Sequence, residues 1–131
     1  MPKYALFFTY TSEAWDVMVE TPRDRVAQSR AVVEAANGTM EAVYWMFGPH
    51  DGLCIFDAPD SVAAGAVSVA IGSTGSFKQL ETHELLTQDK LTELLGAARE
   101  CRRRYQSPTR RPSAVPNTSP VGGLGAGSDR D

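Results

Sequence analysis

Two adjacent side chains, His50 and Asp51, have the chemistry needed for proton transfer. They lie between two apolar runs in the segment Gly48-Pro49-His50-Asp51-Gly52, which is typical of a hairpin loop. An imidazole titrates near neutral pH, so His50 could act as a general base or bind an anion, with Asp51 assisting. We favour a simpler alternative, in which Asp51 hydrogen-bonds its own turn and His50 is merely exposed, because adjacent turn residues rarely converge on one substrate atom.

The second histidine, His83, falls late in a polar segment that is expected to form the last strand. If that strand runs opposite to the first, at about 3.3 Å per residue, His50 and His83 should lie at opposite ends of one subunit. The sequence has no His-x-x-x-His or Cys-x-x-Cys spacing, and no glycine motif of a nucleotide-binding loop. We therefore expect no cofactor and no metal, with only a metal site shared between subunits left open.

Aromatic residues supply the candidate ligand-binding side chains, which are Tyr10, Trp15, Tyr44 and Trp45. If the first two strands are parallel, the hairpin lies at the sheet end where the first strand ends and the first helix begins. Tyr10 and Trp15 can then border one pocket mouth with the hairpin histidine and aspartate, where the helix N-terminus favours an anionic group. Tyr44 and Trp45 point to opposite faces of their strand. One ring could stack on a substrate, but core or dimer packing is the alternative that we favour.

Cys54 and the arginine clusters allow two further functional readings, each with a structural alternative. Cys54 is expected to be a small buried hydrophobic residue, because no basic neighbour in the sequence lowers its pKa to make a nucleophile. The clusters Arg102–Arg104 and Arg110-Arg111 could bind nucleic acid phosphates, or the first could complement a helix C-terminus. Residues 1–100 carry seven basic and fourteen acidic side chains and would repel a duplex, so nucleic acid is not the expected partner.

Composition divides the chain into one folded domain and a tail. The 131 residues are 42% hydrophobic and 22% charged, which is typical of an ordinary soluble globular chain. No apolar run reaches the ~18 residues of a membrane span, and two cysteines are too few for a disulfide framework, so we expect a cytoplasmic protein. Residues 106–131 hold four of eight prolines and no aromatic residue. We predict a folded domain over 1–105 and a disordered tail over 106–131.

Sequence patterns predict the elements that would position these side chains. Ser12 is expected to cap a first helix, which restarts near Thr21-Pro22, and Asn37-Gly38 to end it. Strands are predicted over 3–10, 39–47, 53–57 and 75–86, and later helices over 61–73 and from 88 onward.

The resulting order, β-α-β-β-α-β with an added C-terminal helix, predicts an α+β, ferredoxin-like fold with a four-stranded antiparallel sheet. The first and third strands would be central, and both are apolar on their two faces. Two-sided apolar strands imply that both sheet faces are covered. The two main helices can cover one face, so we expect a partner subunit to cover the other and the protein to be a homodimer.

Three stretches carry a family resemblance: the segment Asn37–Asp51, then Ala58-Pro59-Asp60, then Leu85-Leu86-Thr87. From about residue 2 to about residue 98, the chain resembles the GYD-domain family. Its signature places a glycine and then Tyr-Asp in the hairpin after the second strand; Gly48 and Asp51 match, and His50 stands where the tyrosine is expected. The resemblance implies a dimeric α/β barrel, a fold shared with small cofactor-free oxygenases, and it implies no common reaction.

Three functions are compatible with these residues. The favoured one is a homodimer that binds a small metabolite in a barrel pocket without turning it over. The second is a cofactor-independent oxygenase or isomerase with His50 as base and Tyr10 or Asp51 assisting, which draws mainly on fold kinship. The third is a structural or assembly protein that makes its contacts through the Arg-rich tail.

Overall fold

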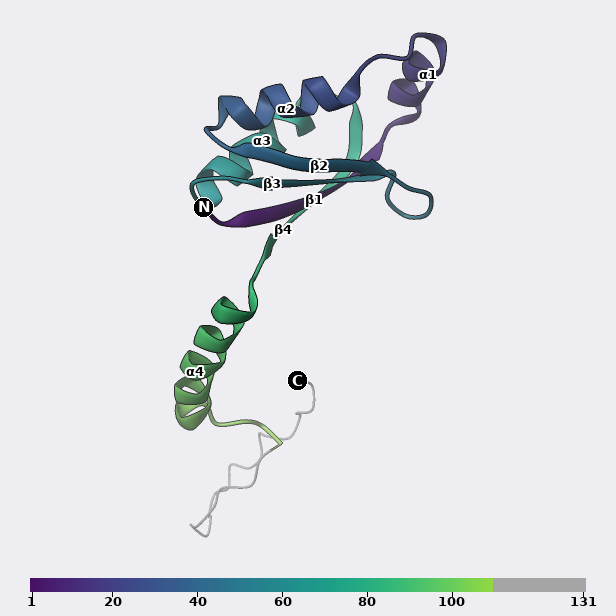
Figure 1. The fold of residues 1–131 in the computed structure, drawn as a ribbon. Coiled ribbons are helices and arrows are strands. Elements are labelled where there is room, and N and C mark those ends of the chain that lie inside the picture. The colour runs from purple at the N-terminus through teal and green to yellow at the C-terminus, as the bar shows by residue number, and fades with distance from the viewer. Residues whose placement is uncertain (110–131) are drawn as a thin grey trace. The chain divides into compact units, whose positions relative to one another are not determined.

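The computed structural model describes residues 1–109 (Figure 1). The elements in chain order are β1 (Lys3–Tyr10), α1 (Ser12–Glu20), α2 (Arg25–Ala35), β2 (Thr39–Trp45), β3 (Gly52–Asp57), α3 (Ser61–Gly72), β4 (Phe77–Leu85) and α4 (Gln88–Arg104). The chain forms two compact units, one over Met1–Thr87 and one that begins at Gln88. Most of the tail predicted over 106–131 lies outside the described residues.

The first unit contains one four-stranded sheet in the order β2-β3-β1-β4, and each neighbouring pair of strands is antiparallel. This order confirms the ferredoxin-like prediction, with β1 and β3 in the centre. Because β1 and β2 both run antiparallel to β3, they are parallel to each other, as expected. Figure 1 shows α2 and α3 on the same face of this sheet.

Polar caps explain where the helices begin. The side chain of Thr11, rather than the predicted Ser12, accepts a hydrogen bond from the backbone N–H of Ala14 and caps α1, because Thr11 is the last extended residue after β1. Asp24 and Asp60 cap α2 and α3 in the same way. After α2, Asn37 adopts a φ of 64°, the left-handed conformation expected at a helix end.

The sheet face under α2 and α3, which we call the covered face, holds the hydrophobic core. Alternate residues of β1 and β3 point to it, and Phe56 is fully buried at its centre. Val33 of α2 and Val67 of α3 pack against it from the helices. The other core residues are Tyr4, Leu6, Met40, Cys54, Ala58 and Ala64.

The opposite face, which we call the open face, carries no helix of the Met1–Thr87 unit (Figure 1). Strand alternation places Phe7 of β1 and Leu53 and Ile55 of β3 on it, and all three are only partly buried. Tyr44 of β2 pairs with Leu53 and is 63% exposed. Apolar residues of both central strands therefore remain within reach of water in a single chain.

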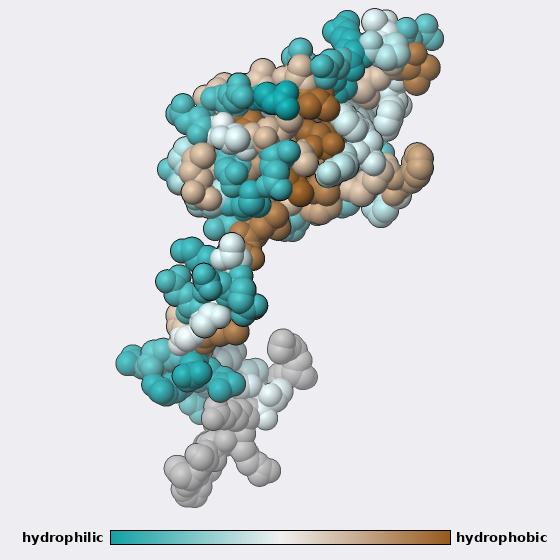
Figure 2. All heavy atoms as spheres, in the orientation of Figure 1, coloured by the Kyte–Doolittle hydropathy of each residue, from teal (hydrophilic) through white to brown (hydrophobic). Residues whose placement is uncertain are grey.

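Helix α4 is amphipathic but has no buried residue. Its leucines Leu91, Leu94 and Leu95 are all exposed, and its last turn carries Arg102–Arg104. Figure 2 shows hydrophobic residues interrupting the hydrophilic surface along the segment that leads from β4 through α4. Among residues 1–109, no helix has the length and apolar character needed to cross a bilayer.

Candidate functional site

The hairpin between β2 and β3 is fastened to the end of β1 through Asp51. One carboxylate oxygen, Oδ2, accepts hydrogen bonds from the backbone N–H of Tyr10 at 2.9 Å and from the indole Nε1 of Trp15 at 3.2 Å. The Thr9 hydroxyl donates to the Pro49 carbonyl at 3.1 Å. The hairpin thus lies at the predicted sheet end, but the Asp51 carboxylate bonds β1 and α1 and not its own turn.

His50 turns to the open face, although it is the residue next to Asp51. Its ring lies against the Phe7 ring, with centroids 5.2 Å apart, and its side chain is 22% exposed. Its Nε2 lies 3.6 Å from Glu81 Oε2, and its Nδ1 is buried with no hydrogen-bond partner among the described residues. The structure therefore does not bring His50 to the group formed by Tyr10, Trp15 and Asp51.

The prediction that His50 and His83 lie at opposite ends of the subunit is wrong. His83 Nε2 lies 3.3 Å from Glu81 Oε1, so the two imidazoles flank one carboxylate, and the His83 ring also contacts Phe7. The physical reason is the register. His83 pairs with Ala5 and Glu81 with Phe7, while the hairpin folds its histidine back over the middle of β1.

The shared carboxylate does not by itself make a metal centre. Within residues 1–109 there is no group of three or more His, Cys, Asp or Glu side chains arranged to hold a metal ion. Glu81 lies too far from His50 Nε2, at 3.6 Å, for a normal hydrogen bond, so this contact is an ion pair only when the imidazole is protonated. His50, Glu81 and His83 therefore form a partly exposed polar cluster on the open face.

Tyr10 is the centre of an aromatic cluster at the end of β1. Its ring lies 5.0 Å from that of Trp15 and 5.1 Å from that of Phe77, measured between centroids. The Trp45 indole Nε1 donates a hydrogen bond of 3.3 Å to the Tyr10 hydroxyl. Three of the four predicted ligand-binding residues, Tyr10, Trp15 and Trp45, therefore come together. Tyr44 does not join them, because it points to the open face.

A cavity of about 290 Å³ lies between the covered face and the two helices α2 and α3. Its apolar wall comes from β1, β3, both helices and the start of β4, and consists of Leu6, Phe8, Tyr10, Val32, Val33, Cys54, Val67, Ile71 and Phe77. Its polar side chains come from the first turns of α2 and from the loop after α3, and are Arg25, Gln28, Ser29, Thr74 and Ser76. Of the predicted site residues, Tyr10 alone lines this cavity.

Arg25 is the cavity residue that sequence reasoning missed. It is the first residue of α2, directly after the capping Asp24, and it is only partly exposed. Its Nε is buried and has no hydrogen-bond partner among the described residues. The position of a basic residue in the first helical turn, where acidic residues are usually favoured, was the one available signal.

Cys54 has the inert environment that the sequence predicted. It is buried at 5% exposure, and desolvation raises the pKa of its thiol from 9.0 to about 11. A thiol with such a pKa is protonated at neutral pH and is a poor nucleophile. Cys54 therefore contributes to the apolar wall of the cavity and has no sign of covalent chemistry.

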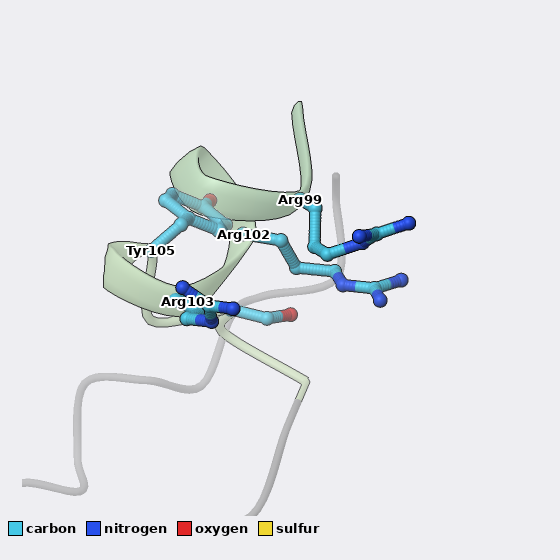
Figure 3. Close-up of a pocket in the computed structure, with 5 residues that line it drawn as sticks. Arg99, Arg102, Arg103 and Tyr105 are labelled. Atoms are coloured by element: carbon cyan, nitrogen blue, oxygen red, sulfur yellow. The ribbon is translucent and has the colours of Figure 1, made fainter. Parts of the chain in front are cut away.

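A second concavity, of about 830 Å³, is open to solvent at the end of α4. It is lined by Arg99, Arg102, Arg103, Tyr105 and Ser107, and Figure 3 shows the Arg99 and Arg102 side chains extending in the same direction. One helix end and the residues after it form this surface, so it lacks the enclosing walls of a small-molecule pocket. Arg103 is also paired with Glu100 within the helix.

Comparison with known proteins identifies the family. The GYD domain family matches residues 4–95, which include the cavity, the hairpin and all of the sheet except Lys3. No curated protein matches the chain. Since the match covers more than half of the 131 residues, the chain belongs to the GYD domain family.

Proposed function

We propose that this protein is a homodimer that binds a small metabolite in the cavity between the covered face and the helices α2 and α3. The observation that carries the proposal is the cavity itself, which combines an apolar wall with polar side chains from α2 and from the loop after α3. Its volume of about 290 Å³ is at the small end of the range for ligand pockets. A metabolite with a compact aromatic or branched aliphatic body is the class of ligand that fits.

The homodimer part of the proposal depends on the open face. Phe7, Leu53 and Ile55 are only partly buried, and Tyr44 is largely exposed. A second copy placed across this face by a two-fold axis would remove these apolar groups from water in both subunits at once.

A rim substitution tests the cavity. Thr74 lines it and is exposed, whereas the neighbouring Ser73 is exposed and lies outside its lining. The two side chains make equivalent hydrogen bonds to carbonyls of α3, so Thr74→Trp and Ser73→Trp are a matched pair. We expect indole to shift the methyl resonances of Val32, Val67 and Ile71 in two-dimensional NMR of the wild type and of Ser73→Trp, and not of Thr74→Trp. Unshifted cavity methyls in the wild type would contradict the proposal.

Sedimentation equilibrium tests the dimer. The chain has a mass of 14.2 kDa, so the wild type is expected to sediment at about twice this value. Ile55→Lys places a charge on the open face and should give the monomer. Val69→Lys is the control, because Val69 is 72% exposed on α3 and away from the open face. A monomeric wild type at micromolar concentration, with a normal unfolding transition, would remove the dimer from the proposal.

A cofactor-independent enzyme with His50 as base is less well supported by the geometry. The two groups expected to assist, Tyr10 and Asp51, bond each other through the Tyr10 backbone N–H, while the His50 imidazole lies beside Glu81. A carboxylate beside an imidazole can orient a general base, so Glu81 would take the assisting role. Assembly through the C-terminal tail rests mostly on residues outside the described part of the chain.

A further inference from the structure

We infer that the ligand of the cavity carries an anionic group, a carboxylate being the simplest, and that Arg25 binds it. This inference rests on the proposed function, because it specifies the chemistry of the ligand in the same cavity. Arg25 is the one positively charged residue in the cavity lining. The buried Nε of Arg25 has no partner among the described residues.

A guanidinium has five N–H donors and accepts no hydrogen bond, so each buried N–H needs an acceptor. A buried donor without an acceptor is destabilising and is uncommon in folded proteins. Two basic side chains, neither of them buried, have acidic partners among residues 1–109: Lys3 pairs with Glu41 and Asp57, and Arg103 with Glu100. Within the same range, Arg25 makes no ion pair.

The described polar groups near Arg25 do not accept a hydrogen bond from its Nε–H. The carboxylate next in sequence, Asp24, accepts from the backbone N–H of Ala27 as the cap of α2. The Ser29 hydroxyl donates to the Arg25 carbonyl, and the Thr74 hydroxyl donates to the Ile71 carbonyl. These three side chains bond backbone groups, so the Arg25 guanidinium is left to pair with a ligand.

A carboxylate matches a guanidinium in shape as well as in charge. Its two oxygens can accept two parallel N–H bonds from one guanidinium, an arrangement that neutral hydroxyl groups cannot reproduce. The apolar wall, with Phe8, Val67 and Ile71, would contact the body of the same ligand. Residues 1–87 carry five basic and eleven acidic side chains, so the domain as a whole repels anions and the selectivity must come from Arg25.

Titration with benzoate and with benzyl alcohol, followed by the methyl resonances of Val32, Val67 and Ile71, tests the inference. The two probes share a ring and differ in charge. Since a hydrogen bond to a charged group contributes about 1.5–3 kcal/mol, the wild type should bind benzoate at least tenfold more tightly than benzyl alcohol. Arg25→Gln should abolish this preference and leave the affinity for benzyl alcohol within about twofold.

Control variants separate the inference from the proposed function. Arg23→Gln removes an exposed arginine that lies outside the cavity lining, so it should keep the preference for benzoate. Arg25→Lys keeps the positive charge without the planar guanidinium, so it should retain part of the preference for benzoate. Equal binding of both probes by the wild type would overturn the anion inference and leave the cavity proposal intact. Unshifted methyls with both probes at millimolar concentration would overturn the two together.

Discussion

The covered and open faces of one sheet differ in how far their side chains are shielded from water. On the covered face, Phe56 and Leu6 are removed from water by α2 and α3, and the remaining space is a cavity with one arginine at its polar side. On the open face, Phe7 lies under two histidines, and Glu81 lies between their imidazoles. The covered face forms a core within one chain, whereas the apolar side chains of the open face stay partly exposed, which is the observation behind the proposed homodimer.

Two residues that are adjacent in sequence contact different parts of the fold. His50 and Asp51 are consecutive, yet the imidazole contacts the open face and the carboxylate holds the end of β1 to α1. Two neighbouring polar residues therefore serve different parts of the fold. A pair of this kind in a hairpin should be tested one residue at a time, because their substitutions are expected to have different consequences.

The largest expected effect comes from comparing Phe56→Ala with Phe7→Ala. Phe56 is fully buried, so its loss should lower the free energy of unfolding by about 3–5 kcal/mol at every protein concentration. Phe7 is partly buried on the open face, so Phe7→Ala should lower the unfolding free energy of the monomer by less and should also weaken the proposed dimer. Urea unfolding at two protein concentrations measures both. If both variants lost the same unfolding free energy at both protein concentrations, the two faces would not differ in this way.

Asp51→Ala should have the next largest effect, about 2 kcal/mol of unfolding free energy. The substitution leaves the Tyr10 backbone N–H without its acceptor and frees the Trp15 indole. His50→Ala is the control, since a partly exposed hairpin side chain should cost well under about 1 kcal/mol. Urea unfolding followed by tryptophan fluorescence gives both values. A larger loss for His50→Ala than for Asp51→Ala would contradict the roles assigned here.

The smallest effect concerns Cys54 and alkaline pH. Its folded pKa of about 11 lies above the ordinary value of 9.0, so the folded protein keeps a proton that the unfolded chain releases. The free energy of unfolding should therefore fall as pH rises through this interval, by up to about 2 kcal/mol. Cys54→Ala should remove that part of the pH dependence, and Cys101→Ala, at an exposed cysteine, should not. Urea unfolding at about pH 8 and about pH 10.5 makes the comparison.

Most of the fold could be predicted from sequence because each element has a local signal. The aromatic run of β1, the cap Asp60 and the Asn37 turn act over a few residues each. The start of α2 was placed too early, near Thr21-Pro22, because Asp24 is the residue that caps this helix. What the sequence did not show was the bulge in β2, where the register shifts between Met40 and Ala42. Bulges depend on cross-strand contacts, and those are set only when the sheet has formed.

The candidate site was less predictable because it depends on which way side chains turn. The parallel relation of β1 and β2 was enough to bring Asp51 to Tyr10 and Trp15. It did not determine that His50 would fold over Phe7, since a hairpin residue can turn to either face. Arg25 was missed for a similar reason: a helical arginine usually extends into water, and its burial depends on the cavity between α2, α3 and the sheet.

The hairpin is fastened at its base and through Pro49 and His50, and it is exposed at Phe47 and Gly48. The Met46 N–H donates to the Asp51 carbonyl, and the Asp51 N–H donates to the Phe8 carbonyl. Beyond these bonds, Phe47 is fully exposed, and Gly48 has open space around its Cα at a φ of 117°. A peptide inserted between Phe47 and Gly48 would leave both base bonds in place, because lengthening an exposed loop has a small entropic cost. An epitope or a reporter peptide can therefore be grafted at this tip while the sheet and the cavity keep their structure.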